Sequence, residues 1–397
     1  MLDRWKRKSL ADLIEFRNGM NFTQASRGER VKVIGVGDFK DKEVLNDFSD
    51  TPSVTLNGKV NQDDLLEDND LLFVRSNGNK ALIGRCVLVS GVTEPISFSG
   101  FTIRGRVKSD EIDHSFASKL VRSPLFKAHL HRMGGGSSIN NLSQDTLSEF
   151  CFSLPPLPEQ RKIAEILRTW DEAIEKLEAL WATNEGRYSA LARRFFEPCH
   201  PTFPVRSKSW LEFELGDVFR ERNQPGDEKD RLLSITMNGG VIDRDDVGRK
   251  DTSTEDKSKY KLILPGDIGY NTMRMWQGVS GLSALRGVIS PAYTVVTPVS
   301  NRILGRYAAH LFKSRRMVFD FERYSQGLTS DTWNLKFPAF SKIKVFLPPI
   351  DDQEKLADTL DALTAEDIVI GKQVEALTRQ KRGLMQKLLT GEWRVNA

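Results

Sequence analysis

The sequence predicts an α+β protein with two similar mixed α/β domains, separated by two long antiparallel coiled-coil helices and related by an internal pseudo-two-fold duplication. Three observations predict this fold. A heptad pattern of apolar residues follows Pro158, the pattern returns from Leu356, and a β-rich stretch with turn signals precedes each copy. A repeat of about 190 residues is too long for a solenoid unit, so the pattern indicates duplication of a domain plus a helix.

The first long helix is expected within residues 154–197. Its entry is Leu154-Pro155-Pro156-Leu157-Pro158. A residue that precedes proline is steered away from helical angles, so we expect the helix to begin after Pro158. Apolar residues then recur at steps of four and three, which is the seam of a helix that packs against another helix. About 36 residues at ~1.5 Å each would make a rod of ~54 Å. The seam residues are Ile163, Leu167, Trp170, Ile174, Leu177, Trp181, Tyr188, Leu191 and Phe195, with polar Asn184 at the skipped position.

The second long helix repeats the first. LPPIDDQEKLADTL begins at Leu347, 193 residues after LPPLPEQRKIAEIL begins at Leu154. Gln160 and Gln353 coincide in the two copies, and Asp367 and Lys381 interrupt the second seam. Polar seam residues cost stability but can fix register and partner. Gly391 is expected to end this helix. The second seam is Leu356, Leu360, Leu363, Ile370, Val374, Leu377, Leu384 and Leu388.

The duplication extends upstream, and it divides the chain into four segments: a first domain over 1–153, a central helical region over 154–197, a second domain over 205–346 and a C-terminal helical region over 347–397. In the first domain, strands are expected at 31–36, 71–74 and 86–89, and one helix at 115–132. Loops between the paired segments differ almost completely, which indicates a shared scaffold with a variable ligand surface. The pairings include Asp70-Leu71-Leu72-Phe73 with Asp267-Ile268-Gly269-Tyr270, Thr102-Ile103 with Thr294-Val295, and Asn141-Leu142 with Asn334-Leu335.

Composition is ordinary for a globular protein, with 39% hydrophobic and 28% charged residues and a net charge of +4. The three scattered cysteines are typical of reduced thiols in a cytosolic protein. The N-terminal residues have no apolar core of a signal peptide, and no run approaches membrane-spanning length. We therefore expect a cytoplasmic protein with no membrane partner.

Signatures of catalysis and metal binding are missing from the sequence. It contains no P-loop, no HExxH and no GxSxG motif. His129 and His131 lie two apart, on different faces of the expected helix, so a metal site is not expected. Carboxylate pairs such as Asp63-Asp64 stand in polar contexts, where we expect them to be solvated. No catalytic residue and no metal ligand is predicted.

Two pairs of loops carry hydrogen-bonding side chains that suit DNA. Arginine and lysine can bond guanine and asparagine can bond adenine in the major groove. For a single loop, a solvated turn is the stronger interpretation; the aligned pairs favour recognition. The basic clusters at 4–8 and 313–316 could meet phosphates or be solvated equally well. The candidate DNA-binding residues are Arg75, Ser76, Asn77 and Lys80 in the first loop, Ser138, Asn140 and Asn141 in the second, Arg274, Trp276 and Gln277 in the third, and Thr329 and Asn334 in the fourth.

With these doubled segments and the closing GLMQKLLTGEWRV, the chain resembles the DNA specificity (S) subunit of type I restriction–modification systems along its whole length. One departure is Asp351-Asp352 where the first copy has Pro158-Glu159. The resemblance implies a non-catalytic protein that reads a bipartite, asymmetric double-stranded DNA target, one half-site per target recognition domain. Half-sites one helical turn apart, ~34–36 Å, fall within reach of the expected rod.

The resemblance also implies partners and cofactors. Two modification subunits would bind S-adenosylmethionine and methylate adenine. Two restriction subunits would use ATP and magnesium to translocate and cut DNA in host defence. No cofactor is expected on this chain. Two alternatives stay open: a self-sufficient DNA methyltransferase or nuclease with an unrecognised site, and a coiled-coil scaffold with no nucleic-acid role.

Overall fold

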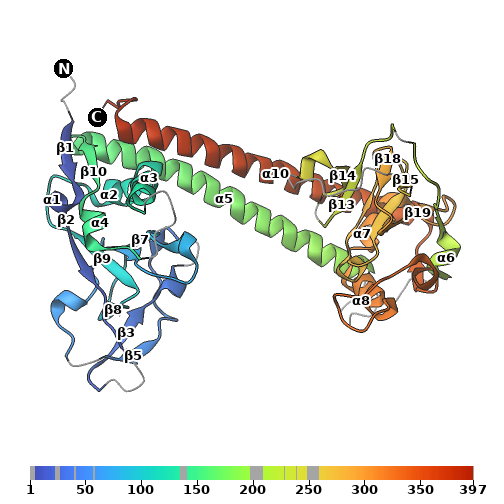
Figure 1. Ribbon diagram of the computed structural model, residues 1–397, viewed down its shortest axis with the longest axis horizontal. Coiled ribbons are helices and arrows are strands. Elements are labelled where there is room, and N and C mark those ends of the chain that lie inside the picture. The colour runs from blue at the N-terminus through green and yellow to red at the C-terminus, as the bar shows by residue number, and fades with distance from the viewer. Residues whose placement is uncertain are drawn as a thin grey trace. The chain divides into compact units, whose positions relative to one another are not determined.

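The computed structural model describes residues 5–22, 27–39, 42–56, 59–134, 141–196, 209–227, 229–237, 239–247 and 259–396. The chain forms two compact units: unit 1 is Met1–Leu177 with Gln373–Ala397, and unit 2 is Glu178–Lys372. Each long helix, α5 (Leu157–Phe196) and α10 (Ile350–Thr390), contributes one part to each unit (Figure 1). Residue contacts therefore group the chain differently from the four segments expected above, whose boundaries stay a prediction.

Unit 1 is built on an antiparallel sheet with one added parallel strand. The strand order is β2-β9-β6-β7-β4, beside a three-stranded sheet β5-β3-β8 and a two-stranded pair β1-β10. Short helices and the start of α5 cover one face. The bounds are β1 (Lys6–Ser9), α1 (Leu10–Leu13), β2 (Ile14–Asn18), β3 (Arg30–Ile34), η1 (Val36–Asp38), β4 (Val44–Leu45), β5 (Ser53–Thr55), η2 (Gln62–Asp64), β6 (Leu71–Val74), η3 (Lys80–Leu82), β7 (Cys86–Val89), β8 (Ile96–Phe98), β9 (Thr102–Val107), α2 (His114–Leu120), α3 (Pro124–Met133), α4 (Gln144–Ser148) and β10 (Cys151–Leu154).

Unit 2 repeats this plan. Its main sheet runs β12-β19-β16-β17, the same order as β2-β9-β6-β7, and β11-β20 matches β1-β10. The internal duplication is therefore confirmed in the strand order. The bounds are β11 (Leu211–Glu214), α6 (Leu215–Val218), β12 (Phe219–Glu221), β13 (Leu233–Thr236), β14 (Gly240–Asp243), η4 (Asp245–Val247), β15 (Lys261–Ile263), β16 (Ile268–Asn271), η5 (Met275–Gln277), β17 (Ser280–Leu282), β18 (Gly287–Ile289), β19 (Tyr293–Pro298), α7 (Gly305–Leu311), α8 (Arg315–Tyr324), α9 (Phe337–Phe340) and β20 (Lys344–Leu347).

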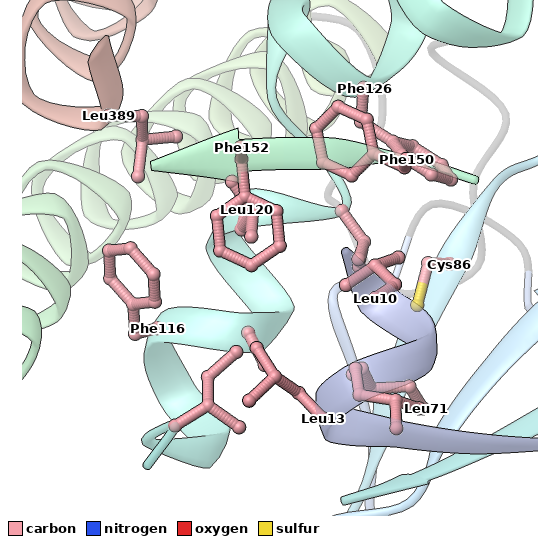
Figure 2. Packing of buried hydrophobic residues seen from close by; sticks show 14 of the residues in the cluster. Leu10, Leu13, Leu71, Cys86, Phe116, Leu120, Phe126, Phe150, Phe152 and Leu389 are labelled. Carbon is pink, nitrogen blue, oxygen red and sulfur yellow. The ribbon is translucent and has the colours of Figure 1, made fainter. Parts of the chain in front are cut away.

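The long helices belong to the domain cores. In unit 1, Leu167 of α5 and Leu389 of α10 are buried in one cluster with Phe116 and Leu120 of α2. Figure 2 shows Leu389 beside the residues of α2 and β10 in this cluster. In unit 2, Leu360 of α10 is buried with the α7 residues. Burial of apolar side chains therefore fixes each domain to the helices that it contacts.

The seam polar residues find partners inside each unit. In unit 2, Asn184 is 1% exposed, and its amide nitrogen donates to the Leu363 carbonyl (3.0 Å) and to Asp367 Oδ1 (2.8 Å). In unit 1, Lys381 of α10 pairs with Asp171 of α5. These pairs join the antiparallel helices, as expected for polar residues that fix register and partner.

Three expectations about local structure are wrong. α5 begins at Leu157, before Pro158, because a proline in the first turn lacks only an N–H that has no intrahelical partner. The single helix expected over 115–132 is two helices: Pro124 begins α3, and the Ser123 side chain accepts from the Phe126 amide to cap it. Asp64 is buried instead of solvated.

Asp64 is 7% exposed and pairs with Arg17 Nη2 at 2.6 Å. Burial by itself would raise the pKa of the Asp64 carboxyl, but hydrogen bonds from Arg17 and the Asn61 amide hold that pKa below its usual value. The Asp64 carboxylate therefore has a structural role, because it forms an ion pair with Arg17 of β2.

The alignment of Thr102-Ile103 in the first copy with Thr294-Val295 in the second is wrong by one residue. Asp70 and Asp267 are equivalent, because each accepts the backbone amide three residues before it. Val74 and Asn271 each lie four residues after these aspartates and are therefore equivalent. Val74 pairs with Thr102 across the sheet, whereas Asn271 pairs with Tyr293. Thr102 therefore corresponds to Tyr293.

Candidate nucleic-acid interface

The first candidate loop leaves the end of β6, the central strand of the unit 1 sheet. Arg75, Ser76 and Asn77 are half-buried, and Lys80 is exposed at the start of η3. The Asn77 side-chain oxygen accepts from the Asn79 amide (2.8 Å), which closes a turn as the Asn-Gly sequence predicts. The loop therefore presents one guanidinium, two side-chain amides and one ammonium group within six residues.

The equivalent loop of unit 2 follows β16 and holds an aromatic pair. Arg274 and Gln277 are exposed, while Trp276 is half-buried. The Trp276 ring lies edge-on to Trp333 with centroids 5.4 Å apart. Trp333 was not among the candidate residues, although its loop was. The two units therefore present different chemistry from equivalent positions.

In both units the two candidate loops meet through one equivalent hydrogen bond. In unit 1, the Leu142 amide donates to the Arg75 carbonyl (2.8 Å); in unit 2, the Leu335 amide donates to the Thr272 carbonyl (2.9 Å). The residue before each leucine is a candidate: Asn141, which is exposed, and Asn334. The structure therefore brings the loops of each unit together, although they are more than 50 residues apart in the sequence.

The remaining candidates differ in placement. Ser138 and Asn140 lie outside the described residues. Thr329 is exposed, and its amide donates to Thr332 Oγ1 (3.1 Å). The Asn334 side-chain oxygen is buried and has no hydrogen-bond partner in the part of the chain that is described, so this side chain would have to reorient to reach a base.

Lys313, from one of the basic clusters, is not a free surface charge. Its ammonium donates to the Met237 carbonyl (3.0 Å) and to the Gly278 carbonyl (2.7 Å). Burial lowers the pKa of Lys313 to about 8. Gly278 adopts φ +78°, a left-handed conformation that favours glycine at the end of η5. Lys313 therefore ties the 237 and 278 loops together beside the candidate residues of unit 2.

One residue at the unit 1 loop was missed by the sequence reasoning. Phe101 lies in the turn between β8 and β9, and its carbonyl accepts from the amides of Arg75 (2.8 Å) and Ser76 (3.3 Å). The side chain of Phe101 is 63% exposed. Its position directly before Thr102 was available from the sequence, but its contact with Arg75 depends on the pairing of β6 with β9.

Within the described ranges, no three histidine, cysteine or carboxylate residues form a group that could hold a metal ion. His129 is packed against Phe126 and Phe150 and bonds the Thr146 carbonyl (2.8 Å). Among the described helices, none is long and apolar enough to cross a membrane.

Comparison with known proteins gives a consistent result. The sequence model of a family described as "Type I restriction modification DNA specificity domain" matches residues 3–180 and again 207–379. The EcoKI specificity subunit of Escherichia coli is 22% identical over 371 residues, which cover 85% of this chain and 78% of that protein. The MjaVIII specificity subunit of Methanocaldococcus jannaschii is 22% identical over 369 residues, covering 85% and 82%.

Solved structures share the fold. The S subunit of a type I restriction–modification system from M. genitalium superposes with a TM-score of 0.59 at 16% identity, over 98% of this chain and 96% of that one. A chain from another type I system gives a TM-score of 0.60 at 13% identity, over 99% and 100%. The family match extends over both halves of the chain. This chain therefore belongs to the type I restriction–modification DNA specificity family, whose members are the non-catalytic subunits that recognise the DNA sequence.

Proposed function

We propose that this chain reads a bipartite, asymmetric target in double-stranded DNA, with one half-site read by unit 1 and the other by unit 2. The observation that carries the proposal is the equivalent hydrogen bond, Leu142 to Arg75 and Leu335 to Thr272, which joins the two candidate loops in each unit. The scaffold that holds the loops is the same in both units, and the side chains on the loops differ. Two readers of one design with different side chains suit a target whose halves differ in sequence.

In unit 1, Arg75 and Lys80 would donate to guanine, and Asn77 or Asn141 would pair with adenine. In unit 2, Arg274 and Gln277 would contact base edges beside the Trp276–Trp333 pair. Ser76 and Thr329 would bond bases or phosphates with their hydroxyl groups. Ser138, Asn140 and Asn334 complete the proposed set, with the reorientation of Asn334 noted above.

The partners follow from the same proposal. Two modification subunits would bind this chain. Two restriction subunits would join the complex by binding to the modification subunits. S-adenosylmethionine, ATP and magnesium would bind to those partners and not to this chain. The relatives are named specificity subunits of type I restriction enzymes, which supports an assembly of this kind. Because the target is chromosomal or invading DNA, the complex would work in the cytoplasm.

The test uses equivalent positions in the two units. Asn77→Ala and Arg274→Ala are each assembled with the modification subunits, and the methylated sequence is mapped on genomic DNA. We expect Asn77→Ala to relax one position of one half-site and Arg274→Ala to relax one position of the other. Each good base contact is worth about 1–3 kcal/mol of discrimination. Asp50→Ala, an exposed acidic residue of unit 1, is the control and should leave the target unchanged.

Three results would contradict the proposal. The first is that the assembled complex methylates no defined sequence. The second is that both variants alter the same half-site. The third is that S-adenosylmethionine binds the isolated chain, which would instead favour a self-sufficient methyltransferase.

A further inference from the structure

The turn between β8 and β9 presents a large apolar side chain beside the start of the polar loop 75–80 of unit 1. Phe101 is 63% exposed, whereas Phe98, three residues earlier, is completely buried. Single exposed apolar residues are common on protein surfaces and need no explanation by themselves. Phe101 differs because of what holds its backbone and because unit 2 provides an internal comparison.

The backbone of this turn is held from two sides. On one side, the Phe101 carbonyl accepts from Arg75 and Ser76, and Arg75 Nη1 donates to the Gly100 carbonyl (3.2 Å). On the other side, the Gly100 amide donates to the Met20 carbonyl (2.8 Å). A Cβ at Gly19 would lie 2.1 Å from the Ser99 carbonyl oxygen, so the two segments approach as closely as glycine permits. The backbone that carries the Phe101 side chain is therefore held in place by hydrogen bonds on both sides.

Unit 2 builds the equivalent turn without an aromatic side chain. The Thr272 amide, equivalent to that of Arg75, donates to the Ala292 carbonyl (3.3 Å), and the Thr272 hydroxyl donates to the same oxygen (2.8 Å). Ala292 is exposed, as Phe101 is. The turn requires a backbone carbonyl at this position, and an alanine supplies it. The phenyl group of Phe101 is therefore not needed for the fold.

We propose that Phe101 is a specificity-determining residue that contacts the C5-methyl group of a thymine in the half-site read by unit 1. The inference rests on the proposed function, because it places Phe101 beside Arg75 in the same groove. Phenylalanine makes apolar contact with the thymine methyl, which lies in the major groove. Arginine bonds guanine in that groove. The thymine is expected at a base pair next to the one that Arg75 reads.

The test is a methyl-deletion cycle on the assembled complex of the full chain with its modification subunits. Once the target is mapped, each thymine of the first half-site is replaced in turn by uracil, which lacks only the methyl group. Loss of one buried methyl contact should weaken binding of the wild-type complex about fourfold at a single position. Phe101→Ala should lose at least this much on thymine DNA and nothing further on uracil DNA. Because Ala292 fills the equivalent position, the variant is expected to fold.

Val44→Ala removes another exposed apolar side chain of unit 1 and is the control; it should keep the full uracil effect. Four outcomes overturn the inference: no thymine in the first half-site, no uracil effect in the wild type, an equal uracil effect in Phe101→Ala, or a sequence-independent loss of affinity accompanied by loss of a DNA kink, which would indicate a wedge between base pairs. If Asn77→Ala changes the half-site while any of these holds, the proposed function stands and only this inference fails.

Discussion

Replacement of Gln160 by leucine tests how each domain is fixed to the long helices. Gln160 is fully buried near the start of α5. Its Oε1 accepts from the Asp113 amide (2.8 Å), and its Nε2 donates to the carbonyls of Glu111 (2.8 Å) and Pro155 (2.8 Å). The side chain thus joins the segment before α2 to the entry of α5.

The expected loss of unfolding free energy depends on how deeply the three backbone groups that lose their hydrogen-bond partner are buried. The Pro155 bond is buried, and an unsatisfied buried group costs about 1–3 kcal/mol. The other two bonds are half-buried, so water can replace part of each, at about 0.5–1.5 kcal/mol. We expect Gln160→Leu to lower the free energy of unfolding of unit 1 by about 2–6 kcal/mol.

Unit 2 supplies the matched variant, because Gln353 repeats the arrangement. It accepts from the Leu304 amide (3.0 Å) and donates to the carbonyls of Arg302 (3.0 Å) and Pro348 (2.9 Å). Hydrogen exchange followed by mass spectrometry in increasing urea reports each unit separately. Gln160→Leu should reduce protection in unit 1 and Gln353→Leu in unit 2.

Lys162→Leu, two residues further along α5 and exposed, is the control and should change protection by less than about 0.5 kcal/mol. The prediction fails if Gln160→Leu changes the protection of unit 1 by less than about 0.5 kcal/mol, or if it reduces protection in both units equally.

Three further predictions concern polar contacts of the helices. Asn184→Leu should lower the free energy of unfolding because it leaves half-buried Asp367 unpaired, and adding Asp367→Leu should recover it; additive effects in this double-mutant cycle would refute the coupling. Burial raises the pKa of Glu43, but Arg122, Lys119 and Lys381 together lower it to about 2. Because Glu43 is 40% exposed, we expect its charge to contribute only ~1–2 kcal/mol. That advantage over Glu43→Gln should be complete above pH 4.5 and lost as pH falls to about 2; a pH-independent difference would contradict it. Glu159→Gln should expose residues 391–396 to proteolysis, because Glu159 accepts from Arg394 (2.7 Å); an unchanged cleavage rate would count against this.

Local features of the chain were predictable from the sequence. The strands β6 and β7 have the bounds expected from their apolar runs, and α10 ends before Gly391, which adopts φ +74°. The seam residues Leu167 and Leu388 are buried in one core cluster, and Leu191 packs in another with Leu360. Asn184 of the first seam donates to Asp367 of the second, because the spacing of seam residues is set by the helix repeat. The duplicated order of elements also follows from the sequence, since two copies of one pattern fold alike.

Contacts between strands could not be predicted from the sequence pattern. The side-chain direction alternates along a strand, so a pairing error of one residue reverses which face a side chain occupies. The error at Thr102 hid the equivalence of Phe101 with Ala292. The burial of Asp64 by Arg17 was missed for a related reason, because the partner comes from β2 and no local spacing reports it.

The sequence by itself therefore determined two domains of one design, their long helices and the loops that vary between them. Those features depend on periodicity and on repetition, both of which are visible in the order of residues along the chain. Only the tertiary structure decided that Arg75 lies against Gly100 and Phe101, and that the two loops of each unit meet at Leu142 and at Leu335. Those contacts depend on sheet register, which backbone hydrogen bonds between distant strands fix and which no short stretch of sequence contains.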